Sequence, residues 1–200
     1  MATRREELAQ AATDYAFEHG LIGLSLRPLA EAIGTSDRML LYHFRGKDDL
    51  VTTILQTANA RSMTTLREVP ASADLRSAVL DLWRAVSTGD QQACQRLYLE
   101  AAALGLFGRE PYASEVREVN ATWMGALAEH FMQTGLGRSA ARRVAYLVDS
   151  TFMGLQLDEA LDSRARLRRT VSDLADTVAA QWAPFETRRP SGPQQAPGRA

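Results

Sequence analysis

The sequence has few of the features that mark secreted and membrane proteins. Its 200 residues include a single cysteine, Cys94, which cannot form an internal disulfide and so favours a reducing compartment. No apolar run reaches the roughly 18 residues that a membrane span needs. The charged start, MATRREELAQ, does not resemble a secretion signal. We therefore expect a cytoplasmic protein that makes no membrane contact.

Signatures of catalysis and of cofactor binding are also missing. The three histidines, His19, His43 and His130, lie far apart and show no paired metal-ligand spacing. Cys94 has no histidine close to it in the sequence. There is no Gly-x-Ser-x-Gly motif, Walker loop or dinucleotide fingerprint. An all-helical enzyme is therefore the least favoured function, and we expect neither a metal nor a cofactor.

The sequence also has no excess of charge of either sign, because the net charge is only −1. This balance excludes a protein that coats nucleic acid through charge alone. Residues 1–50 even carry eight acidic residues against six basic ones. The stretch from Arg38 to Lys47, however, contains three basic residues and no acidic one. Any binding to DNA must depend on this local face.

Helical periodicity dominates the sequence, whereas strand-like alternation is almost absent. Thr3 and Glu6 have the spacing of a capping box, which predicts a first helix that continues to about His19 and ends at Gly20. Longer helices are expected near residues 74–88 and 91–107, from Pro111 to the break at Thr134–Arg138, and over two further apolar stripes. The sequence therefore predicts an all-α fold of about nine helices.

The first 50 residues predict three short helices joined by tight turns. Ser25 can cap the second helix, Gly34 can stop it, and Ser36 can cap a third helix from Asp37 to about Phe44. Two short helices joined by a turn that contains glycine form a helix-turn-helix, whose second helix can lie in the major groove of DNA.

The third of these helices has two different faces. Leu40 and Phe44 share one side, which indicates core anchors. Arg38, Leu41 and Tyr42 share another side, which is expected to face outward. Arginine can pair with guanine and an apolar side chain can contact a thymine methyl group, so this face suits the reading of base edges.

These segments together resemble the N-terminal domain of the tetracycline repressor (TetR) family of bacterial regulators. LSLRPLAEAIGTS (Leu24–Ser36) is similar to the family's Thr-x-x-x-Ile-Ala-x-x-x-Gly-Val-Ser segment. LLYHF and the following KDDL are similar to its Leu-Tyr-x-His-Phe-x-x-Lys-x-x-Leu segment. The resemblance runs from about Arg5 to Leu50, and the other 150 residues resemble the family only in the number and lengths of their helices.

The resemblance implies a set of DNA contacts, to which the outward face of the third helix adds Leu41, at a position where the family usually has tyrosine. The set comprises Ser25, Arg27, Thr35, Ser36, Asp37, Arg38, Met39, Leu41, Tyr42, His43 and Lys47. Structural roles remain open for four of them. Asp37 would favour the helix dipole, His43 would be half-buried, Lys47 would be a solvated charge, and Leu41 would belong to the core.

The resemblance also implies a division of the chain. Residues 1–48 would bind DNA, residues 49–183 would bind an effector and dimerise, and residues 184–200, rich in Pro, Gly and Gln, would form a disordered tail. The last two helices carry apolar stripes that suit a four-helix dimer interface, although the same stripes would suit an intramolecular core. The dimer candidates are Val144, Leu147, Val148, Thr151, Leu155, Leu167, Val171, Leu174 and Val178.

An effector pocket is predicted from large apolar residues and from polar residues in apolar surroundings. The candidates are Trp83, Tyr98, Glu100, Phe107, Asn120, Trp123, Met124, Phe152 and Gln156. The leading hypothesis is a ligand-responsive repressor that binds a palindromic operator as a homodimer and is released by a small, mainly apolar or aromatic effector. The alternative is a DNA-binding regulator controlled by a protein partner. A cavity of several hundred Å³ would favour the ligand, and a closely packed domain would favour the partner.

Overall fold

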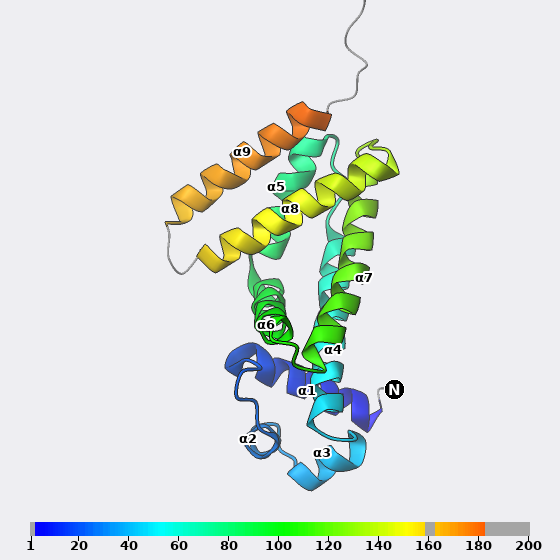
Figure 1. Cartoon of the computed structure of the whole chain (residues 1–200), viewed down its shortest axis with the longest axis vertical. Helices are drawn as coiled ribbons and strands as arrows, with labels where there is room; N and C mark the ends of the chain where they lie inside the picture. Colours follow the sequence, from blue (N-terminus) through cyan, green and yellow to red (C-terminus); the bar gives the residue numbers. More distant parts are fainter. Residues whose placement is uncertain (1–2, 159–162, 183–200) are drawn as a thin grey trace, which may run out of the picture.

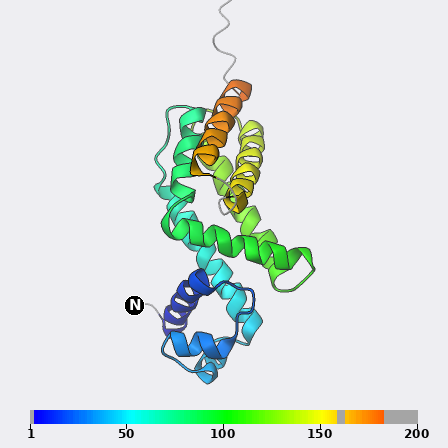
Figure 2. The ribbon, with the colours of Figure 1, turned by 90° about the vertical axis from the view of Figure 1, so that its left-hand side faces the viewer.

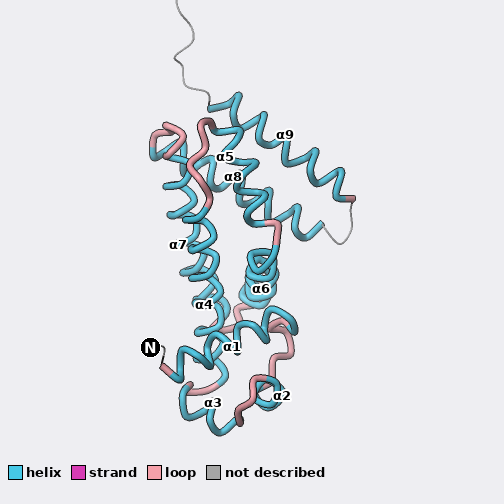
Figure 3. Tube along the Cα trace, turned by 180° about the vertical axis from the view of Figure 1, so that it is seen from behind, coloured by secondary structure: helices cyan, strands magenta, loops and turns pink. Residues whose placement is uncertain are grey.

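The computed structural model describes residues 3–158 and 163–182, and every element of secondary structure in these ranges is an α-helix (Figure 1, Figure 3). The helices are α1 (Arg4–His19), α2 (Leu26–Ala32), α3 (Asp37–His43), α4 (Lys47–Glu68), α5 (Leu75–Val86), α6 (Gly89–Leu106), α7 (Tyr112–Met132), α8 (Arg138–Asp158) and α9 (Arg164–Trp182). The prediction of an all-α fold of about nine helices is confirmed. The predicted tail, residues 184–200, lies outside the described residues.

Local capping signals explain where the first helices begin. The Thr3 side chain accepts a hydrogen bond from the Glu6 amide while the Glu6 carboxylate accepts one from the Thr3 amide, which completes the capping box. Ser36 caps α3 by accepting from the Met39 amide. Ser25 occupies the N-cap position of α2, as predicted, but its side chain makes no capping hydrogen bond.

The lower core joins the first three helices to the longer helices above them. Leu29 of α2, Leu40 of α3 and Leu50 of α4 are buried together with Leu97 of α6. Figure 1 shows α2 and α3 at the lower end of the molecule, with α1 between them and α6. The lower core continues across the predicted domain boundary at residues 48 and 49 into α4, α6 and α7. Packing therefore does not separate two domains at this point, and the boundary stays a prediction.

The upper core is formed by α5, α8 and α9 with the C-terminal half of α7. Figure 2 shows α8 and α9 at the end of the molecule away from α2 and α3. Six of the nine predicted dimer residues are at most 8% exposed in this core, namely Val144, Val148, Leu155, Leu167, Val171 and Val178. The apolar stripes therefore belong to the interior of the subunit, and the dimer prediction needs correction for these six. Leu147 is 40% exposed, whereas Thr151 and Leu174 are partly buried.

Helix α4 contributes to both cores. Leu50, Val51, Ile54 and Leu55 belong to the lower core, whereas Leu66 near its C-terminal end belongs to the upper core. One continuous helix of 22 residues thus connects the helix-turn-helix to the rest of the molecule. None of the helices in the described ranges is long and apolar enough to cross a membrane.

Candidate DNA-binding surface and effector pocket

The recognition helix α3 presents the two faces that its sequence predicts. Leu40 and Phe44 are each 1% exposed, whereas Leu41 is 53% and Tyr42 79% exposed. The core alternative for Leu41 is thereby excluded. Arg38 and Met39, in the first turn, are exposed as well. Helix α3 therefore offers one arginine among exposed apolar and aromatic side chains, at the end of the molecule away from α8 and α9 (Figure 1).

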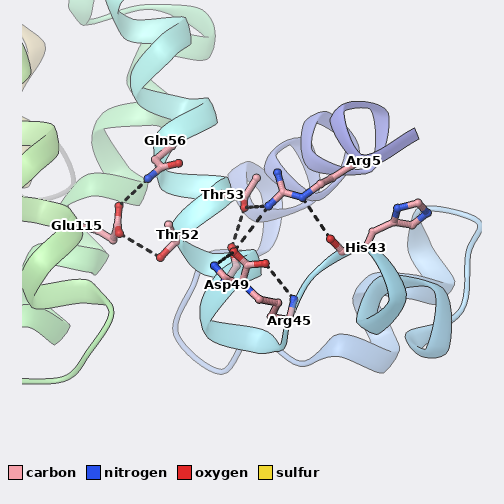
Figure 4. Close-up of polar contacts among 8 residues, drawn as sticks. All are labelled: Arg5, His43, Arg45, Asp49, Thr52, Thr53, Gln56 and Glu115. Atoms are coloured by element: carbon pink, nitrogen blue, oxygen red, sulfur yellow. Dashed lines mark hydrogen bonds and ion pairs between the residues drawn. The ribbon is translucent and has the colours of Figure 1, made fainter. Parts of the chain in front are cut away.

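A polar network holds the C-terminal end of α3 between α1 and α4 (Figure 4). Arg5 of α1 donates from Nε to the carbonyl oxygen of His43 at 3.2 Å, and its Nη2 lies 3.7 Å from Asp49 Oδ1. Asp49 Oδ2 accepts from the Arg45 amide at 3.0 Å, and the Arg5 guanidinium lies over the Phe44 ring at 4.9 Å. These contacts fix the orientation of α3 relative to the rest of the lower core.

The other predicted DNA residues lie around α3. Ser25 and Arg27 are exposed at the start of α2, where Arg27 Nε donates to Glu31 at 3.1 Å. Thr35, in the turn before α3, is partly buried. Lys47 is exposed at the start of α4, and among the described residues no ion pair includes Lys47 or Arg38. Both cations are therefore available to phosphates or base edges.

Asp37 and His43, for which the sequence left a structural role open beside a DNA contact, each contact a neighbouring residue. Asp37 is exposed in the first turn of α3, and its Oδ1 accepts from the Arg38 amide at 2.9 Å, which is the role expected of an acid at a helix N-terminus. His43 is half-buried and packs edge-on against the Tyr42 ring at 5.1 Å.

Glu100 of α6 connects the large helical region to the loop between α1 and α2. Its Oε2 accepts from the backbone amides of Leu21 at 2.7 Å and Ile22 at 3.0 Å. A Cβ atom on Gly20 would lie 2.7 Å from Glu100 Oε1, and Gly20 has a positive φ of 77°, so this position requires glycine. Glu100 thus lies at the contact with the DNA-binding helices, where it lines a pocket of about 190 Å³ between α1 and α6.

A small, partly open cavity lies between α4, α6, α7 and α8. Its volume is about 40 Å³, which is enough for a few water molecules and far below several hundred Å³. It is lined by Leu55, Ala58, Asn59, Ser62, Cys94, Gln95, Leu97, Tyr98, Val119, Asn120, Trp123, Asp149 and Met153. Of the nine predicted effector residues, the cavity brings together Tyr98, Asn120 and Trp123.

The remaining predicted effector residues lie elsewhere. Phe107 is 83% exposed beyond the end of α6. Met124 and Phe152 are buried in the upper core, where Phe152 packs edge-on against Trp83 at 4.9 Å. Trp83 lines an open groove of about 840 Å³ between α5 and α9. Gln156 donates to the Val86 carbonyl oxygen at 3.5 Å and does not line the cavity.

The comparisons with known proteins agree with the helix-turn-helix geometry. Residues 8–54 match the model of the tetR family of bacterial regulatory proteins. This match covers the helix-turn-helix and the start of α4, so the N-terminal part of the chain is similar to the DNA-binding domain of that family. Curated protein sequences give no match to this chain.

Solved structures share the fold over nearly the whole chain. A transcriptional regulator from Rhodococcus sp. is 22% identical, covers 90% of this chain and 97% of its own, and has a TM-score of 0.70. A TetR regulator from Legionella pneumophila is 15% identical over 90% and 98% of the two chains, with a TM-score of 0.72. The multidrug binding protein EbrR, in complex with imidazole, is 23% identical over 87% and 96%, with a TM-score of 0.64.

The sequence analysis did not single out two polar groups that line the cavity. Asp149 of α8 accepts a hydrogen bond from Trp123 Nε1 at 2.7 Å, and Asn59 of α4 has a buried Oδ1 with no hydrogen-bond partner. A signal for Asp149 was present, because it is the one charged residue within the apolar stretch VAYLVDSTFMGL. The rule that selected Asn120 and Gln156, a polar residue in apolar surroundings, would also have selected Asp149.

Burial changes the acid–base properties of the titratable groups on the lining. It raises the pKa of Asp149, and the hydrogen bond from Trp123 opposes this shift. Burial also raises the pKa of Tyr98, with a further increase from the nearby Asp149 carboxylate, and it raises the pKa of the Cys94 thiol. A carboxylate held in apolar surroundings is disfavoured as an anion, so a positive charge beside it would be stabilising.

Proposed function

We propose that this protein is a TetR-family regulator, a ligand-responsive repressor that binds a two-fold operator as a homodimer. The proposal rests on the position of the cavity beside the helices that support α3. The cavity is lined by α4, which continues from the helix-turn-helix, and by α6, whose Glu100 holds the α1–α2 loop. Enlarging the cavity would move the two helices that support α3.

The proposed operator contacts come from the exposed side of α3. Arg38 pairs with guanine and Leu41 packs against a thymine methyl group. Tyr42, which is more exposed than Leu41, takes over part of the backbone contact that the family's tyrosine makes one position earlier. Lys47 binds a phosphate at the start of α4.

The proposed dimer uses the outer side of α8, since the inner stripes are buried. Tyr146, Leu147 and Leu157 are 60%, 40% and 59% exposed, respectively. Ser150 and Gly154 lie between them on the same side of the helix and are exposed and small, so a second helix could approach closely. A dimer is favoured because one recognition helix contacts few bases and a two-fold operator needs two.

The proposed control is an exchange between two conformations. The operator fits only one spacing of the two recognition helices, and the effector fits only the enlarged cavity. DNA and effector then bind with opposing preference. EbrR, which has the same fold, holds a small molecule.

A second candidate function, control by a protein partner, is favoured by the cavity volume of about 40 Å³. A closely packed large region needs no small molecule. Direct measurement of small-molecule binding to the purified protein distinguishes the two.

Selection from a random pool of double-stranded DNA tests the DNA-binding part. We expect one preferred two-fold sequence, bound in the presence of competitor DNA, with an affinity that falls steeply as salt rises. Arg38→Ala should relax the preference at one base position and cost about 1–3 kcal/mol of discrimination. The control, Arg84→Ala on α5, should leave the selected sequence unchanged. Absence of any preferred sequence would remove the proposal.

A further inference from the structure

The cavity lining is apolar and aromatic with a single charged side chain. Tyr98 and Trp123 supply the rings, and Asp149 is the only charged residue among the lining residues. An effector that fitted only apolar walls would leave this carboxylate desolvated, which disfavours its charged form.

Asp149 has no basic partner among residues 3–158 and 163–182. Its recorded partner is the neutral Trp123 Nε1–H, and none of the ion pairs between described residues includes it. The charge is therefore uncompensated within the described structure, unlike Asp14 or Asp176, which pair with Arg61 and Arg76.

A second hydrogen-bond acceptor on the lining has no donor among the described residues. Asn59 Oδ1 is buried and unpaired, and Asn59 of α4 lines the same cavity as Asp149 of α8. A buried acceptor without a donor costs free energy, so both acceptors would be stabilised by a ligand that brings N–H groups.

We propose that the effector of this site is an organic cation, with an ammonium or amidinium group between Asp149 and Asn59 and an apolar or aromatic body against Tyr98 and Trp123. This inference rests on the ligand-responsive function proposed above and names the chemical class of its ligand. The charged group would form an ion pair with Asp149 in surroundings of low polarity, and the rings would add cation–π attraction.

The cavity must enlarge to accept such a molecule, because about 40 Å³ holds only water-sized groups. Met153 of α8 lines the cavity, and its flexible unbranched side chain can be displaced at low cost. Displacement of Tyr98 moves α6, which carries Glu100 two residues further on. The same change that admits the cation therefore acts on the contact with the α1–α2 loop.

Isothermal titration calorimetry of the full chain, without DNA, tests the proposal with three probes that share a phenyl ring on a four-carbon chain. The probes are 4-phenylbutylammonium, 4-phenylbutan-1-ol and 4-phenylbutanoate, which differ in charge. We expect the ammonium to bind at least about tenfold more tightly than the alcohol, a difference of about 1.4 kcal/mol, and the carboxylate to bind most weakly. Equal or tighter binding of the alcohol, or no binding of any probe, would overturn the proposal.

Two matched variants locate the effect. Asp149→Asn keeps an oxygen that can accept from Trp123 Nε1 and removes the charge, so the ammonium should fall to the affinity of the alcohol while the alcohol is unaffected. Asp158→Asn, on the exposed end of the same helix, should change neither. Retention of the ammonium preference in Asp149→Asn would refute the role of this carboxylate.

The pH dependence gives an independent readout. The titratable groups on the lining are Asp149, Tyr98 and Cys94, and only the charge of Asp149 changes in the acidic range, because the phenol and the thiol stay neutral there. Ammonium binding should weaken as the pH is lowered toward the pKa of Asp149, and alcohol binding should not. Because no DNA is present, a negative result here leaves operator binding intact, whereas failure of the DNA selection would overturn the proposed function itself.

Discussion

Removal of the Glu100 carboxylate should loosen the contact between α6 and the DNA-binding helices. In the wild type this carboxylate accepts from two backbone amides of the α1–α2 loop, at 2.7 and 3.0 Å. A net hydrogen bond to a charged group contributes about 1.5–3 kcal/mol. The Leu21 amide is partly buried and would lose most of that amount, whereas the exposed Ile22 amide can bond water and would lose about 0.5–1 kcal/mol.

The sum predicts that Glu100→Ala lowers the free energy of unfolding by about 2–4 kcal/mol, less a few tenths for the better helix propensity of alanine. Urea unfolding followed by circular dichroism measures this change. Hydrogen exchange measures it locally, because the amides of Leu21 and Ile22 should exchange faster while those in the middle of α8 should not.

Glu115→Ala provides the matched control. Glu115 of α7 also joins the large region to the lower helices, but it accepts from the side chains of Thr52 at 3.2 Å and Gln56 at 3.3 Å (Figure 4). These donors can rotate toward water, so the loss should stay near 0.5–1 kcal/mol. If the two variants were equally destabilised, or if exchange at Leu21 were unchanged in Glu100→Ala, the reasoning would be refuted.

Three further predictions concern α3, the upper core and the outer side of α8. Ser36→Ala removes the cap on the Met39 amide and should cost about 1 kcal/mol of unfolding free energy together with some operator affinity, and unchanged thermal stability would contradict it. Burial lowers the pKa of His130 from its ordinary 6.5, so its neutral form is favoured in the fold, and stability is complete above pH 6.5 and declines as the pH falls below that value toward the lowered pKa. His130→Leu also removes an unpaired buried Nε2 and should flatten this decline, which unfolding curves at several pH values would check. Leu147→Glu should shift the protein toward monomer in sedimentation experiments with the subunit fold intact, and a dimer of wild-type strength would mean that the interface lies elsewhere.

The DNA-binding end was the part most accessible from sequence, because its determinants are local. Capping by Thr3 and Ser36 follows from spacing alone, and the inward and outward sides of α3 follow from 100° per residue. Ser25 was the exception, since its position before α2 is correct but its hydroxyl makes no capping bond.

The large region was harder because its determinants are contacts between distant helices. Periodicity identified the stripe through Val144 and Val148 but could not tell an interior face from a dimer face. Glu100 and Asp149 are both acids in apolar stretches, yet one binds backbone amides 79 and 78 residues away and the other faces a cavity. Only the packing of α6 against α1, and of α8 against α7, separates these roles.

The continuous helix α4 would act as a lever, because a small tilt at one end produces a larger displacement at the other. Nineteen residues separate Lys47, beside the recognition helix, from Leu66 in the upper core, which corresponds to about 29 Å of rigid rod. A tilt of about 5° around Leu66 would displace the DNA end by about 2.5 Å. In a two-fold dimer the spacing of the two recognition helices would then change by about 5 Å, which exceeds the roughly 3.4 Å between neighbouring base pairs. A movement of less than one atomic diameter at the cavity would therefore be enough to put both recognition helices out of step with the groove.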